Sequence, residues 1–123
     1  MTLYAALLYY PPERYWLDPA EAGTAPGYAK FFEAATTAGV LRGGEALHPS
    51  DRACTVTIAG GEGGDVEVSQ GSPGPATDVL GGFYLIEAAD ADQAVGWAAR
   101  IPAAWRGRVE LRPVVPMQNK LGR

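Results

Sequence analysis

The chain has 123 residues, 47% hydrophobic and 20% charged, which is enough for one globular domain and too little for two. Its formal net charge of -4 provides no positive field for phosphate groups, so we expect no nucleic-acid partner. One cysteine and one histidine supply only half of a usual zinc ligand set, so we expect neither a metal site nor an internal disulfide.

The first predicted element is a strand over residues 2–10, whose two faces are both apolar. A strand of this kind is covered on both sides in the folded protein. The same run is too short to span a bilayer, and Pro11-Pro12 follows it in place of a cleavage site. We therefore expect a cytoplasmic protein with no membrane partner.

Helical patterns follow the first strand. Residues 18–21 are typical of a helix start, which Pro26-Gly27 then interrupts. The first main helix begins after that break, because apolar side chains recur at helical spacing and Gly39 lies where a left-handed C-terminal cap is needed. Its predicted buried face consists of Tyr28, Phe31, Phe32 and Ala35.

The middle of the chain predicts a β-hairpin. Apolar and polar residues alternate on both sides of the glycine-rich turn at residues 60–64. One face of the hairpin should therefore be exposed to solvent and the other buried. On this pattern Cys54 alternates with core residues, and we expect a buried and unreactive thiol. The alternating apolar residues are Cys54, Val56, Ile58, Val66 and Val68.

The last third of the chain repeats the order of strand, helix and strand. Residues 83–88 predict a second central strand, apolar on both faces near its start. Asp90 and Gln93 form a capping-box pattern before a helix with an apolar stripe, which Pro102 ends. Residues 108–114 alternate cleanly and include a proline, which is typical of an edge strand.

This order of elements predicts an α+β fold of the ferredoxin-like kind, a split β-α-β domain with an antiparallel sheet. Helices that join neighbouring strands cover only one face of such a sheet. Because the central strands are apolar on both faces, the second face needs a cover, and a second copy of the chain would supply it. We expect a homodimer in which residues 1–115 form the domain and residues 116–123 a polar C-terminal tail.

Three segments resemble the YCII-related family, and within it the DGPF subgroup: residues 38–47, 80–86 and 97–104. Residues 110–114 complete a resemblance that extends over nearly the whole chain. The resemblance implies a dimeric α+β barrel, in which the ferredoxin-like sheets of two subunits face one another.

The motif that gives the subgroup its name is degenerate in this chain. Asp-Gly-Pro-Phe falls on residues 70–73, and the Ala-Glu-Thr-Lys-Glu that follows it falls on residues 74–78. Gly71 and the acidic Asp78 match the motif, whereas uncharged residues replace its first carboxylate and its lysine. A role that needs that charge pair is therefore not carried over.

The catalytic residues of the wider family are also replaced. The resemblance implies a catalytic histidine on the first helix and a later aspartate, and Tyr28 and Ile101 occupy these positions here. The best remaining general base is His48 with Asp51 three residues later, because a carboxylate can orient an imidazole that titrates near neutral pH. The alternative is that both are polar loop residues ahead of a strand.

Aromatic side chains with polar tips indicate a binding site. Tyr28 and Tyr84 fall on the first helix and an inner strand, and a pocket between them would suit a small, mostly apolar molecule, with Glu45 at its rim. The alternative is core tyrosines with satisfied hydroxyls and a solvated glutamate. We therefore expect a protein that binds a small molecule, and an enzyme acting without a cofactor is one form of this interpretation. The alternative is a non-catalytic dimeric interaction or regulatory module.

Overall fold

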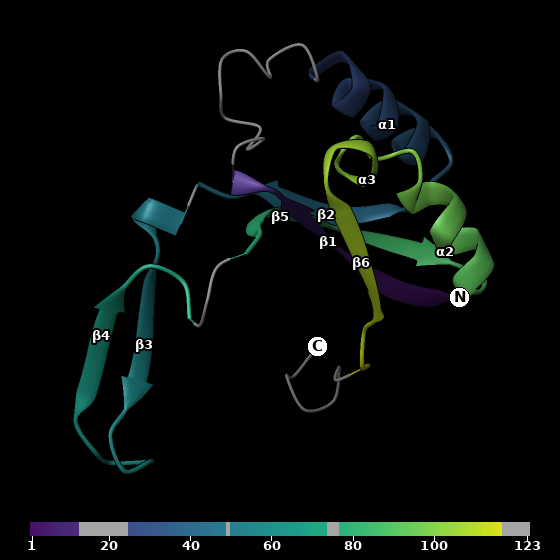
Figure 1. Cartoon of the computed structure of the whole chain (residues 1–123). Helices are drawn as coiled ribbons and strands as arrows, with labels where there is room; N and C mark the ends of the chain where they lie inside the picture. The colour runs from purple at the N-terminus through teal and green to yellow at the C-terminus, as the bar shows by residue number, and fades with distance from the viewer. Residues whose placement is uncertain (13–24, 49, 74–76, 117–123) are drawn as a thin grey trace.

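A computed structural model describes residues 1–12, 25–48, 50–73 and 77–116 of the chain. It shows one sheet with helices on one side and a long two-stranded hairpin that extends from the other (Figure 1). The predicted helix start at residues 18–21 lies outside the described residues.

The main sheet has four strands in the order β2-β5-β1-β6, and each neighbouring pair is antiparallel. Helices connect β1 to β2 and β5 to β6, so the chain has the split β-α-β arrangement of a ferredoxin-like domain. The α+β fold predicted from the sequence is confirmed. The strands are β1 (Thr2–Tyr10), β2 (Leu41–Ala46), β5 (Val79–Ala88) and β6 (Arg108–Pro113).

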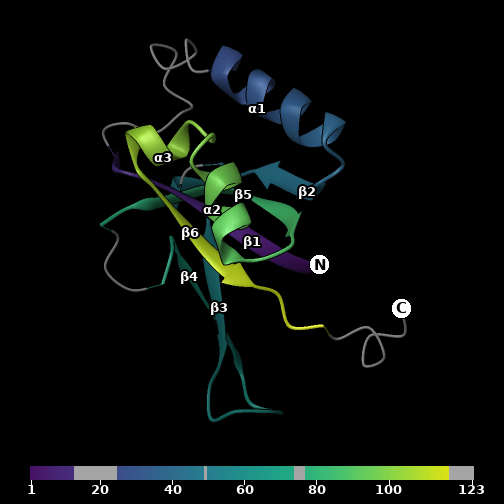
Figure 2. The same ribbon diagram turned by 90° about the vertical axis from the view of Figure 1, so that its right-hand side faces the viewer.

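The helices α1 (Ala25–Thr37), α2 (Ala91–Ala98) and α3 (Ala103–Arg106) lie on the same side of the sheet (Figure 2). The predicted cap of α2 is present, because the backbone N of Gln93 donates to Asp90 Oδ1 at 2.9 Å. The short helix α3, which follows the buried Pro102, was not predicted. Of the helices in the described part of the chain, none has the length and apolar character required to cross a membrane.

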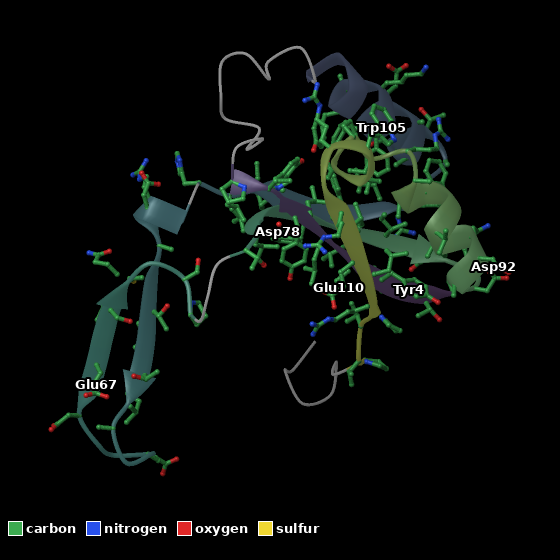
Figure 3. The ribbon with its side chains drawn as sticks, viewed as in Figure 1. Tyr4, Glu67, Asp78, Asp92, Trp105 and Glu110 are labelled. Atoms are coloured by element: carbon green, nitrogen blue, oxygen red, sulfur yellow. The ribbon has the colours of Figure 1, made fainter. Side chains whose placement is uncertain are left out.

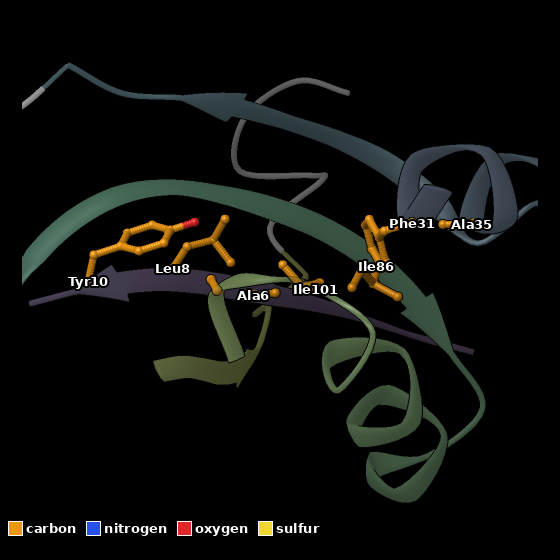
Figure 4. Close-up of a cluster of buried hydrophobic side chains, with 8 residues drawn as sticks. Ala6, Leu8, Tyr10, Phe31, Ala35, Ile86 and Ile101 are labelled. Carbon is orange, nitrogen blue, oxygen red and sulfur yellow. The ribbon is translucent and has the colours of Figure 1, made fainter. Parts of the chain in front are cut away.

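The hydrophobic core fills the space between the sheet and these helices (Figure 4). Phe31 of α1 packs on Tyr84 of β5, with ring centroids 4.9 Å apart, and Ala35 lies one turn further along the same helix face. Phe32 was expected on this face but is more than half exposed, because successive helix residues point about 100° apart. The fully buried hydrophobic residues of the described chain are Ala6, Tyr10, Phe31, Ala35, Ile86, Ala88, Ala94, Ile101 and Ala103.

The two faces of β1 differ in burial. The alternate residues from Tyr4 to Tyr10 are buried beneath the helices, whereas Leu3, Ala5, Leu7 and Tyr9 are half-buried on the other side. We call this second side of the sheet, away from the helices, the open face. The prediction of a strand with two apolar faces is therefore correct, and the structure covers one of them.

The edge strand β2 was not predicted as a strand. Its residues include two glycines and two charged side chains, which have weak intrinsic strand propensity. The strand forms because it pairs closely with β5: a Cβ atom on Gly44 would lie 2.7 Å from the carbonyl oxygen of Phe83. Only glycine allows this close approach.

The predicted hairpin is present as β3 (Cys54–Ile58) and β4 (Val66–Gln70), but its expected burial is wrong. The two strands pair only with each other and stand away from the main sheet, so Val56 and Val68 are mostly exposed. Cys54 is exposed as well, which corrects the expectation of a buried thiol. Alternation in a sequence shows that one face is apolar, but it does not show which surface covers that face.

Candidate functional site: a cleft beside the last strand

A cleft of about 460 Å³ lies where the C-terminal end of β1 meets the start of β6. Tyr9 pairs in register with Arg108 and Leu7 with Glu110, so the side chains of Tyr9, Arg108 and Glu110 share the open face. The segment before β5 closes one side, and it carries Asp78 (Figure 3). The lining residues are Tyr9, Thr77, Asp78, Arg108, Val109 and Glu110.

Asp78 and Arg108 form an ion pair across the cleft, from Arg108 Nη2 to Asp78 Oδ2. The two side chains differ strongly in exposure, since Asp78 is 17% exposed and Arg108 is 73% exposed. A carboxylate that is largely removed from water needs a charged or hydrogen-bonding partner. The partner of this carboxylate is the long, flexible side chain of Arg108, which solvent and solutes reach directly.

Glu110 is held from two sides. The hydroxyl of Tyr9 donates to Glu110 Oε1 at 3.4 Å, and Arg112 Nε donates to Glu110 Oε2 at 2.8 Å. The hydrogen bond to Glu110, together with its negative charge, raises the pKa of Arg112 above its ordinary value, so this guanidinium stays charged. The cleft therefore combines a phenol, two carboxylates and the guanidinium group of Arg108, and Arg112 supports Glu110 from outside the lining.

The predicted tyrosines lie elsewhere, in the layer between α1 and the sheet. Tyr28 and Tyr84 both pack against the same hydrophobic core, so the structure brings these two residues into one region. The hydroxyl oxygen of Tyr28 is buried and has no hydrogen-bond partner among the described residues. Burial raises the pKa of Tyr84 above its ordinary value, so its hydroxyl remains neutral at physiological pH.

The predicted polar residues lie in or just after β2 and are exposed. His48 Nε2 is 3.4 Å from Arg52 Nη1, and Asp51 is exposed in the short helix η3 (Ser50–Arg52). Glu45 pairs in register with Phe83, which places it on the open face. Neither the cleft nor the core cluster around Tyr28 includes any of these three residues. Proton transfer by His48 and Asp51 stays a prediction.

Sequence reasoning did not single out the cleft. Asp78 carried a signal, because it is one of the two residues that match the subgroup motif. The alternation along β6 also placed Arg108, Glu110 and Arg112 on one polar face. Their meeting with Tyr9 depends on pairing between residues 101 positions apart, which no local pattern reveals.

Within residues 1–12, 25–48, 50–73 and 77–116, no group of three His, Cys, Asp or Glu side chains is placed to hold a metal ion. Comparison with protein families matches residues 2–118 to the YCII-related domain. A comparison with curated proteins finds no match.

Proposed function

The chain belongs to the YCII-related family, and we propose that it binds a small polar molecule in the cleft between Asp78 and β6. One observation carries this proposal: a mostly buried carboxylate, Asp78, is neutralised by a mostly exposed guanidinium, that of Arg108. An exposed arginine exchanges partners readily, because a surface ion pair is worth only about 0–1 kcal/mol. A ligand cation or amide can therefore take its place against Asp78.

The groups around the cleft define the chemistry of the ligand. Arg108 and the phenol of Tyr9 are donors, whereas Asp78 and Glu110 are acceptors. A molecule that carries a cationic or N–H group as well as an anionic or carbonyl group would bind both the acceptors and the donors of the cleft. The cleft volume of about 460 Å³ lies within the usual range for small-molecule sites.

We also propose that the chain belongs to the DGPF subgroup of its family. The support is the position of Asp78, which matches the acidic residue at the end of the subgroup motif and lines the cleft. Thr77, which replaces the motif's lysine, lines the cleft beside it. The loss of that lysine leaves Arg108 as the cation that faces Asp78.

We propose in addition that the protein is a homodimer whose subunits meet through their open faces. Leu3, Ala5 and Leu7 are half-buried there in a single chain, and Leu80 is 40% exposed. An apolar sheet face of this kind is normally packed against a second layer. The experiment is light scattering at micromolar concentration on the wild type and on Leu7→Glu, which should convert a dimer into a monomer.

Binding in the cleft is tested by comparing two carboxylate variants. Native mass spectrometry of the purified protein detects a retained molecule, and amide NMR shifts locate fragments that bind. Asp78→Asn should abolish binding. The matched control is Glu87→Gln, since Glu87 is another ion-paired carboxylate, bonded to Arg42 at 2.9 Å outside the cleft. Equal binding by both variants would contradict the proposal.

A second candidate site is favoured by the unpartnered hydroxyl of Tyr28. A small, mostly apolar molecule that inserts between α1 and the sheet would give this hydroxyl a partner, with Tyr84 on the same core. In the enzymatic form of this candidate, His48 and Asp51 transfer the proton without a cofactor. NMR shifts centred on Tyr28 in place of Tyr9 would favour this site over the cleft.

A further inference from the structure

The hairpin formed by β3 and β4, which we call the arm, has one apolar face. Val56 pairs with Val68 and Ile58 with Val66, and strand alternation places all four side chains on the same face. Between 42% and 65% of each of these residues is exposed. Thr57, Glu67 and Ser69 occupy the opposite face.

The arm is not stabilised by packing against the rest of its own chain. Its strands pair only with each other, and both have exposed residues along nearly their whole length. An isolated two-stranded hairpin is at best marginally stable in water. A second surface that covers the four β-branched residues would remove apolar area from water and hold the hairpin in its register.

The direction of the arm indicates which surface this is. It extends to the side of the main sheet away from α1, α2 and α3, which is the side of the open face, and both views agree (Figures 1 and 2). A second copy of the chain seated on the open face would therefore lie beside the arm. The arm continues the surface through which we propose that the homodimer forms.

The charge of the arm also fits a second copy of this chain. The arm carries Glu62, Asp65 and Glu67 but neither lysine nor arginine between residues 54 and 70, which disfavours nucleic acid and anionic membranes. Two mostly exposed cations, Arg108 and Arg112, lie on the open face at the β6 edge. Each of them is paired with a carboxylate of its own chain, and exposed ion pairs are weak enough for these arginines to meet Glu62 and Asp65 at the tip of a second copy's arm.

The area of the open face gives a further reason to expect that the arm takes part in the interface. Taken as a rectangle of four strands about 4.8 Å apart, the open face covers roughly 500 Å². A stable interface buries about 800 Å² on each partner. The apolar face of the arm adds roughly 150 Å², which brings the surface closer to that size.

We infer that the apolar face of the β3–β4 arm docks on a second copy of the chain and clasps it beside the open face. This inference rests on the homodimer proposed above. In a twofold dimer each arm contacts the other subunit, so the four valine and isoleucine side chains of each arm are covered in the same way.

The test uses Val56→Thr/Val68→Thr, which keeps the β-branched shape and removes two apolar methyl groups per arm. Sedimentation equilibrium should show a dimer Kd raised roughly a hundredfold, since a dimer buries four such groups. The matched control is Thr57→Val/Ser69→Thr on the opposite face of the arm, and its Kd should be unchanged. An unchanged Kd for the first variant would overturn the inference while leaving the homodimer intact.

Cys54 provides a direct test, because it is the only cysteine and lies on the apolar face of the arm. Benzophenone maleimide attached to Cys54 should cross-link the subunits in a mixture of ¹⁴N- and ¹⁵N-labelled protein, giving mixed-isotope peptide pairs. Cross-links confined to one isotope would refute docking of the arm on a second copy. A wild-type protein that sediments as a monomer would instead refute the homodimer and, with it, the clasp.

Discussion

Asp78 and Arg108 form an ion pair whose two members have opposite exposure, since the carboxylate is 17% exposed and the guanidinium is 73% exposed. Glu110 and Arg112 form a second pair nearby, in which the carboxylate is 41% exposed. The energetic role of each arginine therefore depends on how much water can reach its carboxylate once the arginine is removed.

We predict that Arg108→Ala lowers the free energy of unfolding by about 1 kcal/mol and that Arg112→Ala lowers it by less. Removal of Arg108 leaves a mostly buried carboxylate without its partner, whereas Glu110 is reached by water and keeps the hydroxyl of Tyr9. Urea unfolding monitored by circular dichroism measures both changes. A larger effect for Arg112→Ala would show that burial of the carboxylate does not control how much stability is lost when its arginine is removed.

Tyr84 should make the stability of the protein depend on pH in the alkaline range. Burial raises its pKa in the folded chain above the ordinary value of 10.0, while the unfolded chain ionises near that value. Above pH 10 the unfolded chain therefore binds fewer protons, and the free energy of unfolding falls as pH rises through the folded pKa. Tyr84→Phe removes this contribution, so its stability should fall less between pH 8 and pH 11 than that of the wild type.

Tyr28→Phe should leave the protein as stable as the wild type or slightly more stable. Its hydroxyl is buried without a partner, and an unsatisfied buried polar group costs about 1–3 kcal/mol. Thermal unfolding measures the effect. If the site between α1 and the sheet is the functional one, this variant should also weaken ligand binding, and His48→Ala should reduce turnover. A clear loss of stability would mean that the hydroxyl has a structural partner.

Gly44→Ala should destabilise the sheet edge by about 1–3 kcal/mol, because the added Cβ would lie 2.7 Å from the carbonyl oxygen of Phe83. Gly43→Ala is the matched control, since its Cβ would lie 3.5 Å from Leu85 Cδ1, an ordinary contact distance. Hydrogen exchange of the β5 amides that face β2 reports the change locally. Equal effects of the two substitutions would argue against the close approach at Gly44.

The sequence predicted those parts of the fold that local patterns specify. The two-faced strand β1, the cap formed by Asp90 and Gln93, and the edge strand β6 each follow from a few neighbouring residues. The strand β2 was missed because its glycines form a strand only through contact with β5. The exposure of the arm was missed for the related reason that local alternation does not show whether another part of the chain packs against the apolar face.

The candidate site was even less accessible from the sequence. Asp78 could be found through its match to the subgroup motif, whereas Tyr9 looks like any other aromatic residue of a central strand. Its position beside Glu110 follows from the register between β1 and β6, and that register is a property of the folded sheet.

The central position of β1 also determines when the sheet can fold during synthesis of the chain. Its neighbours are β5 and β6, and the contact between Tyr9 and Glu110 joins residues 101 positions apart. A nascent chain emerges from the ribosome at about 5–20 residues per second. Several seconds therefore pass between the emergence of β1 and that of β5 and β6, and the apolar side chains of β1 stay unpaired during this time. During that interval β1 is the segment on which we expect a chaperone to act, and the sheet closes only when β6 has left the exit tunnel.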